Sequence, residues 1–241
     1  MKKRLDILML DKKLVTSRND AQKLIEGGRV KVNGILIIKN NFQADEDDNI
    51  EADDANIFVA RSGAKLQEAI NQFDIKIKDF VCLDVGASTG GFTECLLNNG
   101  AKKIYSVDVG SDQLDEKLKE DKRVINLEKT DIRNLKGLEE LVDLIVVDVS
   151  FISILKIIPF LKKFLKKEGR MVLLIKPQYE IKDNKNKKGK VKNDGLVEEV
   201  INDIKEAIKK EGYNVLGVIE SPILGKKGGN KEYLIYCELL A

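Results

Sequence analysis

The chain has 241 residues, of which 34% are charged, but its formal net charge is only +2. A chain of this length can form one large domain or two smaller ones, and any binding of nucleic acid must come from local charge. The sequence contains no histidine, which excludes imidazole bases, Ser-His and Cys-His nucleophile pairs and histidine-ligated metals.

Several further classes of protein are not expected from this sequence. Its three cysteines are scattered without a CxxC spacing, so we expect no disulfide framework and no metal site. The most apolar window, residues 144–160, is interrupted by Asp148, Lys156 and Pro159 and is too short to cross a bilayer. The N-terminus lacks the apolar stretch of a signal peptide. We therefore expect a cytoplasmic protein without a membrane span.

Charge divides the chain into two regions. Residues 1–39 hold ten Lys or Arg and four Asp or Glu, whereas residues 40–54 hold seven acids and no base. A change of this kind is typical of a domain boundary. We expect a small domain over residues 1–58 and a large domain over residues 59–241.

The small domain is predicted to contain two helices and a hairpin. The apolar spacing of "RLDILMLDKKL" predicts the first helix. A capping box at residues 17–20 starts the second helix, at about residues 18–26, and two glycines end it. The stretch "RVKVNGILI" predicts two strands joined by a type I′ turn at residues 33–34. The predicted unit is a small α+β domain with a thin core.

This N-terminal stretch resembles the RNA-binding domain first described in ribosomal protein S4, in its patterns RLD, SR, A..LI..G and V.VNG. The resemblance covers about 50 residues and implies that basic side chains face RNA phosphates. The implied RNA-binding residues are Arg4, Arg18, Lys23 and Arg29 on the helices, with Lys31 and Asn33 at the hairpin. The alternative is that these charges only solvate a helical face.

The large domain is predicted to be an α/β sheet with a doubly wound topology. Short apolar strands alternate with helix-like segments, which favours parallel pairing. The predicted strands lie in "FVCLDVG", "KIYSVDVG", "VINLEKTD", "VDLIVVDVS" and "MVLLIKP". The last two strands, "NVLGVIESP" and "EYLIYCEL", alternate in polarity and are expected to be antiparallel.

A glycine-rich turn at residues 83–93, "LDVGASTGGFT", predicts a ligand site between a strand and a helix. Small residues let a ligand approach the backbone, and the helix N-terminus supplies free N–H groups. Asp108 ends the next strand, where a carboxylate can accept hydrogen bonds from ribose hydroxyls. The phosphate-binding patterns GxGxxG and GxxxxGK[ST] are absent, and Asp84 suits the amino group and sulfonium of S-adenosylmethionine better than a phosphate. The alternative is a turn that serves packing alone.

The same turn resembles the first motif of Rossmann-like methyltransferases, in particular the FtsJ-like group that methylates ribose 2′-hydroxyls. This resemblance implies S-adenosylmethionine as cofactor and an adenine contact from an acid after the third strand, which Asp131 in "KTDIRNL" matches. The expected cofactor-binding residues are Asp84, Gly86, Ala87, Ser88, Thr89, Gly90, Gly91, Asp108, Asp131 and Asp148.

Two charged residues end apolar strands and are therefore candidates for catalysis. Asp148 follows "LIVV" and Lys176 follows "MVLLI", at the edge where parallel sheets bind ligands. Pro177 favours an extended backbone at Lys176. The FtsJ-like resemblance adds Lys65 in "RSGAKL" and Glu232 in "NKEYL" and implies a catalytic tetrad with Asp148 and Lys176.

The tetrad predicts a mechanism for activating a ribose hydroxyl. We expect Lys176, whose neutral amine is favoured by burial and by Lys65, to take or share the 2′-hydroxyl proton. Asp148 and Glu232 would orient the two lysines. The alternative for each charge is a surface ion pair or a loop charge. Arg61, in the same stretch as Lys65, is expected to contact RNA.

An S4-type domain followed by an FtsJ-like domain is the architecture of the TlyA family, and the resemblance extends from Arg4 to Glu238. It implies 2′-O-methylation of cytidine in ribosomal RNA of the large subunit, in some members also of the small subunit, with ribosomal subunits as partners. The family name haemolysin suggests a membrane-lytic protein as one alternative, and an RNA-binding assembly factor without catalysis is another. The lysine-rich segment at residues 182–194 is interpreted either as an RNA-binding arm or as a solvated loop.

Overall fold

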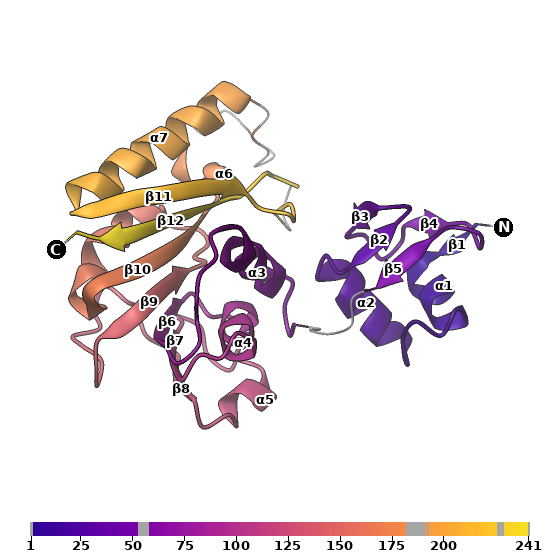
Figure 1. Cartoon of the computed structure of the whole chain (residues 1–241), viewed down its shortest axis with the longest axis horizontal. Helices are drawn as coiled ribbons and strands as arrows, with labels where there is room; N and C mark the ends of the chain where they lie inside the picture. Colours follow the sequence, from indigo (N-terminus) through magenta and orange to yellow (C-terminus); the bar gives the residue numbers. More distant parts are fainter. Residues whose placement is uncertain (1, 53–57, 182–190, 192, 226–228, 241) are drawn as a thin grey trace.

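The computed structural model describes residues 2–52, 58–181, 191, 193–225 and 229–240 (Figure 1). Ten of the 13 residues of the lysine-rich segment at residues 182–194 lie outside this range. Two folded units follow each other along the chain, a small N-terminal domain and a larger domain built around one sheet. None of the described helices is both long and apolar enough to span a membrane.

The small domain contains the predicted helix pair and hairpin. Ser17 caps the second helix by accepting a hydrogen bond from the Asp20 amide at 3.1 Å. Asn33 and Gly34 have φ angles of 53° and 78°, as a type I′ turn requires. Two short strands and one further strand, not expected from the sequence, complete the domain. The elements are β1 (Lys3–Arg4), α1 (Leu5–Asp11), α2 (Arg18–Glu26), β2 (Val30–Val32), β3 (Ile35–Ile37), β4 (Gln43–Ala44) and β5 (Ile50–Ala52).

The large domain is a seven-stranded sheet in the order β11-β12-β10-β9-β6-β7-β8. Five neighbouring strands are parallel, and β12 pairs antiparallel with both β10 and β11, as predicted for the last two strands. The strands are β6 (Val81–Val85), β7 (Lys103–Val107), β8 (Val124–Leu127), β9 (Val142–Val147), β10 (Leu165–Ile175), β11 (Tyr213–Glu220) and β12 (Tyr233–Leu239).

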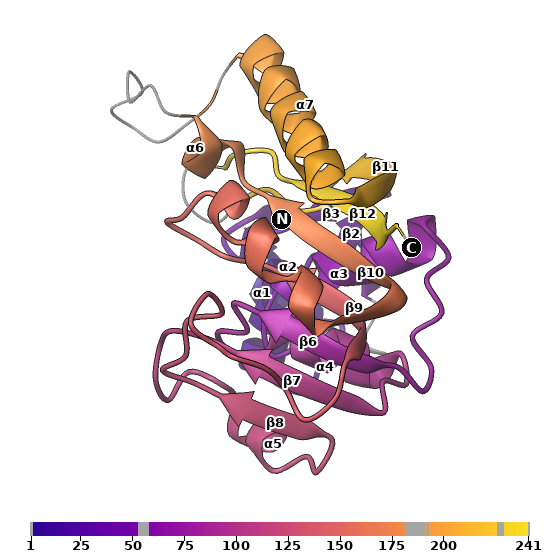
Figure 2. The same cartoon turned by 90° about the vertical axis from the view of Figure 1, so that its left-hand side faces the viewer.

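Helices cover both faces of this sheet (Figures 1 and 2). Alternate residues of β6 point to opposite faces, so Leu83 joins one apolar core and Cys82 the other. The Leu83 face packs against α7 and three short 3-10 turns, and the Cys82 face packs against α3, α4 and α5. These elements are α3 (Ser62–Gln72), α4 (Gly91–Asn98), α5 (Glu116–Lys119), η1 (Ile154–Lys156), η2 (Ile158–Phe160), η3 (Lys162–Phe164) and α7 (Asp194–Lys210).

Strand β10 ends directly before Lys176, the lysine that the sequence predicts at the end of this strand. The strand begins at Leu165, earlier than its apolar run predicts, because a register shift between Leu165 and Arg170 lets polar residues extend its start. Lys176 follows with an extended backbone, φ −118° and ψ 93°, and Pro177 opens the short helix α6 (Pro177–Glu180). The predicted effect of Pro177 on Lys176 is confirmed, since an extended residue before proline avoids a steric clash.

Candidate active site

Two cavities, each of about 500 Å³, lie side by side at the carboxyl edge of the parallel strands. We call them the acidic cavity, which contains Asp108 and Asp131, and the lysine cavity, which contains Lys65 and Lys176. Parallel strands place their carboxyl ends at one edge, so residues far apart in sequence meet there. The two cavities share a wall formed by Gly86, Ser88, Asp148, Ser150 and Phe151.

The acidic cavity is formed by the residues that follow β6, β7, β8 and β9. Asp108 accepts hydrogen bonds from the amides of Ser88, at 2.8 Å, and Gly110, at 2.7 Å, which fix its carboxylate beside the glycine-rich turn. Asp131 pairs with Arg133, whose hydrogen bonds hold the pKa of Asp131 below its ordinary value. Apolar side chains complete the lining: Val85, Val107, Val109, Val149, Ile132, Ile152 and Ile157.

This lining fits an adenosine carrying a positively charged group. Apolar residues can cover a purine, and a charged carboxylate with free acceptor capacity suits ribose hydroxyls. Gly86 has a φ of +87°, and a Cβ there would lie 2.6 Å from the Asp148 carbonyl oxygen. Glycine is therefore required where the turn passes close to the backbone that follows β9. The charged residues of the cavity are mostly acidic, which favours a sulfonium over a phosphate.

Three predicted cofactor residues lie behind the turn and line neither cavity. Asp84 is fully buried, and its Oδ2 accepts a hydrogen bond from Thr93 Oγ1 at 2.7 Å. Burial raises the pKa of Asp84 to about 7. Cβ atoms at Gly90 and Gly91 would collide with Leu118 and with the Ser62 hydroxyl. Packing within the described structure therefore explains why these two positions are glycines.

The lysine cavity collects the four residues of the predicted tetrad. Lys176 Nζ lies 2.5 Å from Asp148 Oδ1, and Lys65 forms a buried ion pair with Glu232. Glu232 reaches this edge because it precedes β12, whose first residue Tyr233 pairs antiparallel with Ile175. Side chains from a helix, two parallel strands and one antiparallel strand thus meet in one cavity. Ala87 and Thr89 of the turn line the same cavity.

Several residues of the lysine cavity were not identified from the sequence. Ser150 Oγ accepts a hydrogen bond from Lys176 Nζ at 2.7 Å. Phe151 is 75% exposed, has a φ of 65° and packs against Tyr179 with ring centroids 5.3 Å apart. Gln178 also lines the cavity. These residues lie two or three positions after Asp148 or Lys176 in sequence, so proximity to those two charges was the only available signal.

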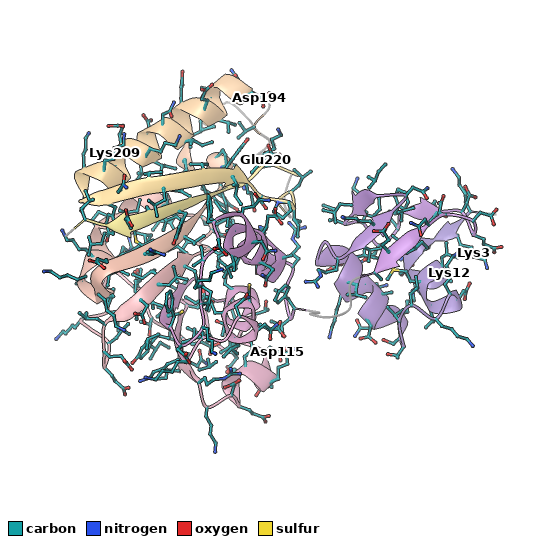
Figure 3. The ribbon with its side chains drawn as sticks, in the orientation of Figure 1. Lys3, Lys12, Asp115, Asp194, Lys209 and Glu220 are labelled. Carbon is teal, nitrogen blue, oxygen red and sulfur yellow. The ribbon has the colours of Figure 1, made fainter. Side chains whose placement is uncertain are left out.

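The small domain contributes a pair of arginines held by a buried acid. Arg4 and Arg18 both donate hydrogen bonds to Asp6, whose side chain has no exposed surface. Burial opposes the charge on Asp6, but hydrogen bonds from Arg4, Gln22 and Arg18 hold its pKa below the ordinary value. Asp6, the acid of the RLD pattern, was not expected to have this role. In Figure 3, Lys3 and Lys12 extend from the side of this domain that faces away from the large domain.

The other predicted RNA-binding residues are dispersed. Lys23 and Lys31 are exposed. The Asn33 side chain donates a hydrogen bond to Asp48 and accepts one from the Asn49 amide, so it also stabilises the hairpin. Arg29 lies over the Phe58 ring at 5.7 Å, which brings the small domain into contact with the large one.

Arg61 borders the lysine cavity and donates a hydrogen bond to the Leu224 carbonyl oxygen at 2.5 Å. Burial lowers the pKa of Arg61 from its ordinary value. Glu26, at the end of α2, lines the same cavity, so the small domain reaches the edge of the candidate active site.

Comparison with known families gives two matches along the chain. The S4 domain model matches residues 3–50, and the FtsJ-like methyltransferase model matches residues 58–238. The second match covers the tetrad, the acidic cavity, all but the last residue of the sheet and, except for Glu26, the lining of the lysine cavity. The fold is shared with S-adenosylmethionine-dependent methyltransferases of known structure, and S-adenosylmethionine is the cofactor of this enzyme class.

Individual relatives match over nearly the whole chain. Hemolysin A of Brachyspira hyodysenteriae is 41% identical over 97% of this chain and 98% of its own length. The 23S rRNA (cytidine-2'-O)-methyltransferase TlyA of Campylobacter jejuni is 36% identical, over 94% and 96%. A putative hemolysin structure from Streptococcus thermophilus has a TM-score of 0.75 and 35% identity, over 99% of this chain and 89% of that one. With its S4 domain followed by an FtsJ-like methyltransferase domain, the chain belongs to the family of the TlyA and hemolysin A proteins.

Proposed function

We propose that the protein transfers a methyl group from S-adenosylmethionine to the 2′-hydroxyl of a cytidine in ribosomal RNA. The observation that supports the proposal is the wall shared by the two cavities: Asp148 lines both cavities, and its ion-pair partner Lys176 lines the lysine cavity, which would be the acceptor site. Cytidine and ribosomal RNA are the substrate of the Campylobacter relative.

The acidic cavity is proposed to hold the cofactor. Asp108 would bind the ribose hydroxyls and Asp131 the adenine side, with Gly86 and Ser88 close to the ligand. Ala87, Thr89 and Asp148 would border the methyl group from the side of the lysine cavity. Asp84, Gly90 and Gly91 would support the turn from behind. S-adenosylmethionine supplies an already electrophilic methyl group, so the protein must activate and align the acceptor.

The lysine cavity is proposed to supply the base. Lys176 takes the proton of the 2′-hydroxyl, and Asp148 holds the amine in place at 2.5 Å. Lys65 and Glu232 line the same cavity as an ion pair, where they would orient the ribose. Holding two reactants in near-attack geometry can contribute roughly 7 to 11 kcal/mol, so most of the rate would come from alignment.

The small domain is proposed to bind ribosomal RNA and to deliver it to this cavity. Arg4 and Arg18 would contact phosphates while Asp6 fixes their direction, with Lys23, Arg29, Lys31, Asn33 and Arg61 as further contacts. We keep the division at residues 1–58 and 59–241 as a proposal, although Phe58 itself packs in the core of the large domain. Ribosomal RNA and ribosomal subunits are the proposed partners.

A methyl-transfer assay on separated ribosomal subunits tests this function. Subunits would come from cells lacking the modification, and tritiated methyl groups from S-adenosylmethionine would be followed into RNA. We expect incorporation by the wild-type protein and none by Lys176→Ala, with both proteins folded. No incorporation into either subunit would favour the assembly-factor alternative. Lysis of erythrocytes by the purified protein, unchanged in Lys176→Ala, would favour the haemolysin alternative.

A further inference from the structure

We infer that Ser150 is a positioning residue that directs the lone pair of Lys176 toward the acceptor hydroxyl. The inference rests on the proposed function, because it assigns a role within the same proton transfer. Ser150 follows β9 two residues after Asp148 and lies in the wall shared by both cavities.

The number of hydrogens on the lysine nitrogen determines how many contacts can orient it. A lysine that accepts a proton must first be a neutral amine, which has two N–H groups and one lone pair. In the described structure Nζ donates a hydrogen bond to Ser150 Oγ at 2.7 Å, whereas Asp148 Oδ1, 2.5 Å away, is an ion-pair partner without hydrogen-bond geometry. Ser150 therefore fixes the direction of one N–H group. The charge of the Asp148 carboxylate attracts the second N–H, which leaves the lone pair facing away from both groups.

Asp148 alone cannot fix that direction. With one acceptor, the amine can still rotate about its Cε–Nζ bond and exchange the positions of its second hydrogen and its lone pair. The Lys176 side chain is only 10% exposed, so water has little access to replace the second acceptor. Ser150 is exposed, and its hydroxyl can rotate to keep an oxygen lone pair facing Nζ.

The proton balance of the step is complete with these groups. The 2′-hydroxyl proton moves to Nζ, which becomes an ammonium with three N–H donors. Two of these donors still face Asp148 and Ser150. The oxygen electron pair forms the new O–C bond, and the pair of the broken S–C bond stays on sulfur.

Three variants test this role in methyl transfer to ribosomal subunits. Ser150→Ala removes the acceptor, Ser150→Thr keeps a hydroxyl at the same position, and Ser111→Ala is a control at an exposed serine that lines neither cavity. For Ser150→Ala we expect kcat to fall roughly 10- to 100-fold, because misplacing a reacting group by a small distance has effects of this size. The KM for subunits, the calorimetric Kd for S-adenosylmethionine and the Tm should stay within about twofold or a few degrees of the wild type.

The pattern across variants distinguishes positioning from a general structural effect. Ser150→Thr should recover most of the kcat lost in Ser150→Ala, and Ser111→Ala should match the wild type. An unchanged kcat in Ser150→Ala would overturn the inference, as would a loss that appears in KM or Tm instead of kcat. Failure of the wild-type protein to methylate any subunit would instead refute the proposed function.

Discussion

The buried pair between Lys65 and Glu232 allows stability and catalysis to be tested separately. Their side chains are only 6% and 4% exposed. Removing one partner of such a pair leaves an uncompensated buried charge and typically costs about 3 to 5 kcal/mol. We therefore expect Glu232→Gln, which leaves the Lys65 ammonium alone, to lower the free energy of unfolding by about 3 kcal/mol at pH 7.5.

Removing the lysine instead of the glutamate should lower the free energy of unfolding by less. Lys65→Met leaves the Glu232 carboxylate, but Arg61 lies close enough to interact with that charge, so we expect a loss smaller by about 1 kcal/mol. The double variant Lys65→Met with Glu232→Gln removes both charges and should be about as stable as Glu232→Gln alone. With single losses of about 3 and about 2 kcal/mol, the interaction energy in this cycle should be about 2 kcal/mol.

Urea unfolding followed by circular dichroism measures these differences. The control pair is Lys76 and Asp74, whose side chains are 78% and 80% exposed, so that Lys76→Met should change stability by less than about 0.5 kcal/mol. Single losses no larger than this control, or losses that simply add in the double variant, would refute the argument. The refolded double variant should still be inactive in methyl transfer. Activity in that variant would mean that the pair serves stability alone.

Three further predictions concern the turn, the cofactor and the RNA. The folded protein keeps a proton on Asp84 up to about pH 7, whereas the unfolded chain loses it near pH 4. The contribution of Asp84 to the free energy of unfolding therefore falls as pH rises from about 4 to 7. Over that range Asp84→Asn should become more stable relative to the wild type, by at most about 4 kcal/mol. Urea unfolding at pH 5 and pH 8 checks this, and a pH-independent difference would contradict it. Asp108→Ala should raise the calorimetric Kd for S-adenosylmethionine at least tenfold, since a hydrogen bond to a charged group is worth about 1.5 to 3 kcal/mol, whereas an unchanged Kd would exclude Asp108 from the cofactor site. Arg18→Ala should weaken RNA binding and lower the slope of log K against log salt by about 1, as filter binding at several salt concentrations would measure; an unchanged slope would argue against a phosphate contact.

Local signals predicted most of the fold because each element carries its own. The capping box at Ser17, the Asn33-Gly34 turn and the apolar runs of β6, β9 and β10 depend on neighbouring residues only, and each forms as expected. The early start of β10 depends on its pairing with β9 and was not predictable from its polar residues. The short strands β1 and β4 likewise exist through pairing with each other.

The candidate site was predictable in part. The strand-end rule identified Asp148 and Lys176 from sequence, because their position depends only on where parallel strands end. Lys65 and Glu232 could be identified only through the family resemblance. The place of Lys65 in the cavity depends on how α3 packs, and that of Glu232 depends on the antiparallel register of β12. Asp6 and Ser150 were missed because their roles depend on side-chain partners: Arg18 lies 12 residues from Asp6, and Lys176 follows a different strand from Ser150.

Analysis of the methylated nucleoside tests the central claim most directly. Ribosomal subunits from cells lacking the modification would be treated with wild-type protein or with Lys176→Ala, and their RNA digested to nucleosides for mass spectrometry. We expect the wild type to produce 2′-O-methylcytidine and Lys176→Ala, folded and able to bind S-adenosylmethionine, to produce none. Equal amounts of 2′-O-methylcytidine from both proteins, or a methyl group found only on a base, would contradict the account.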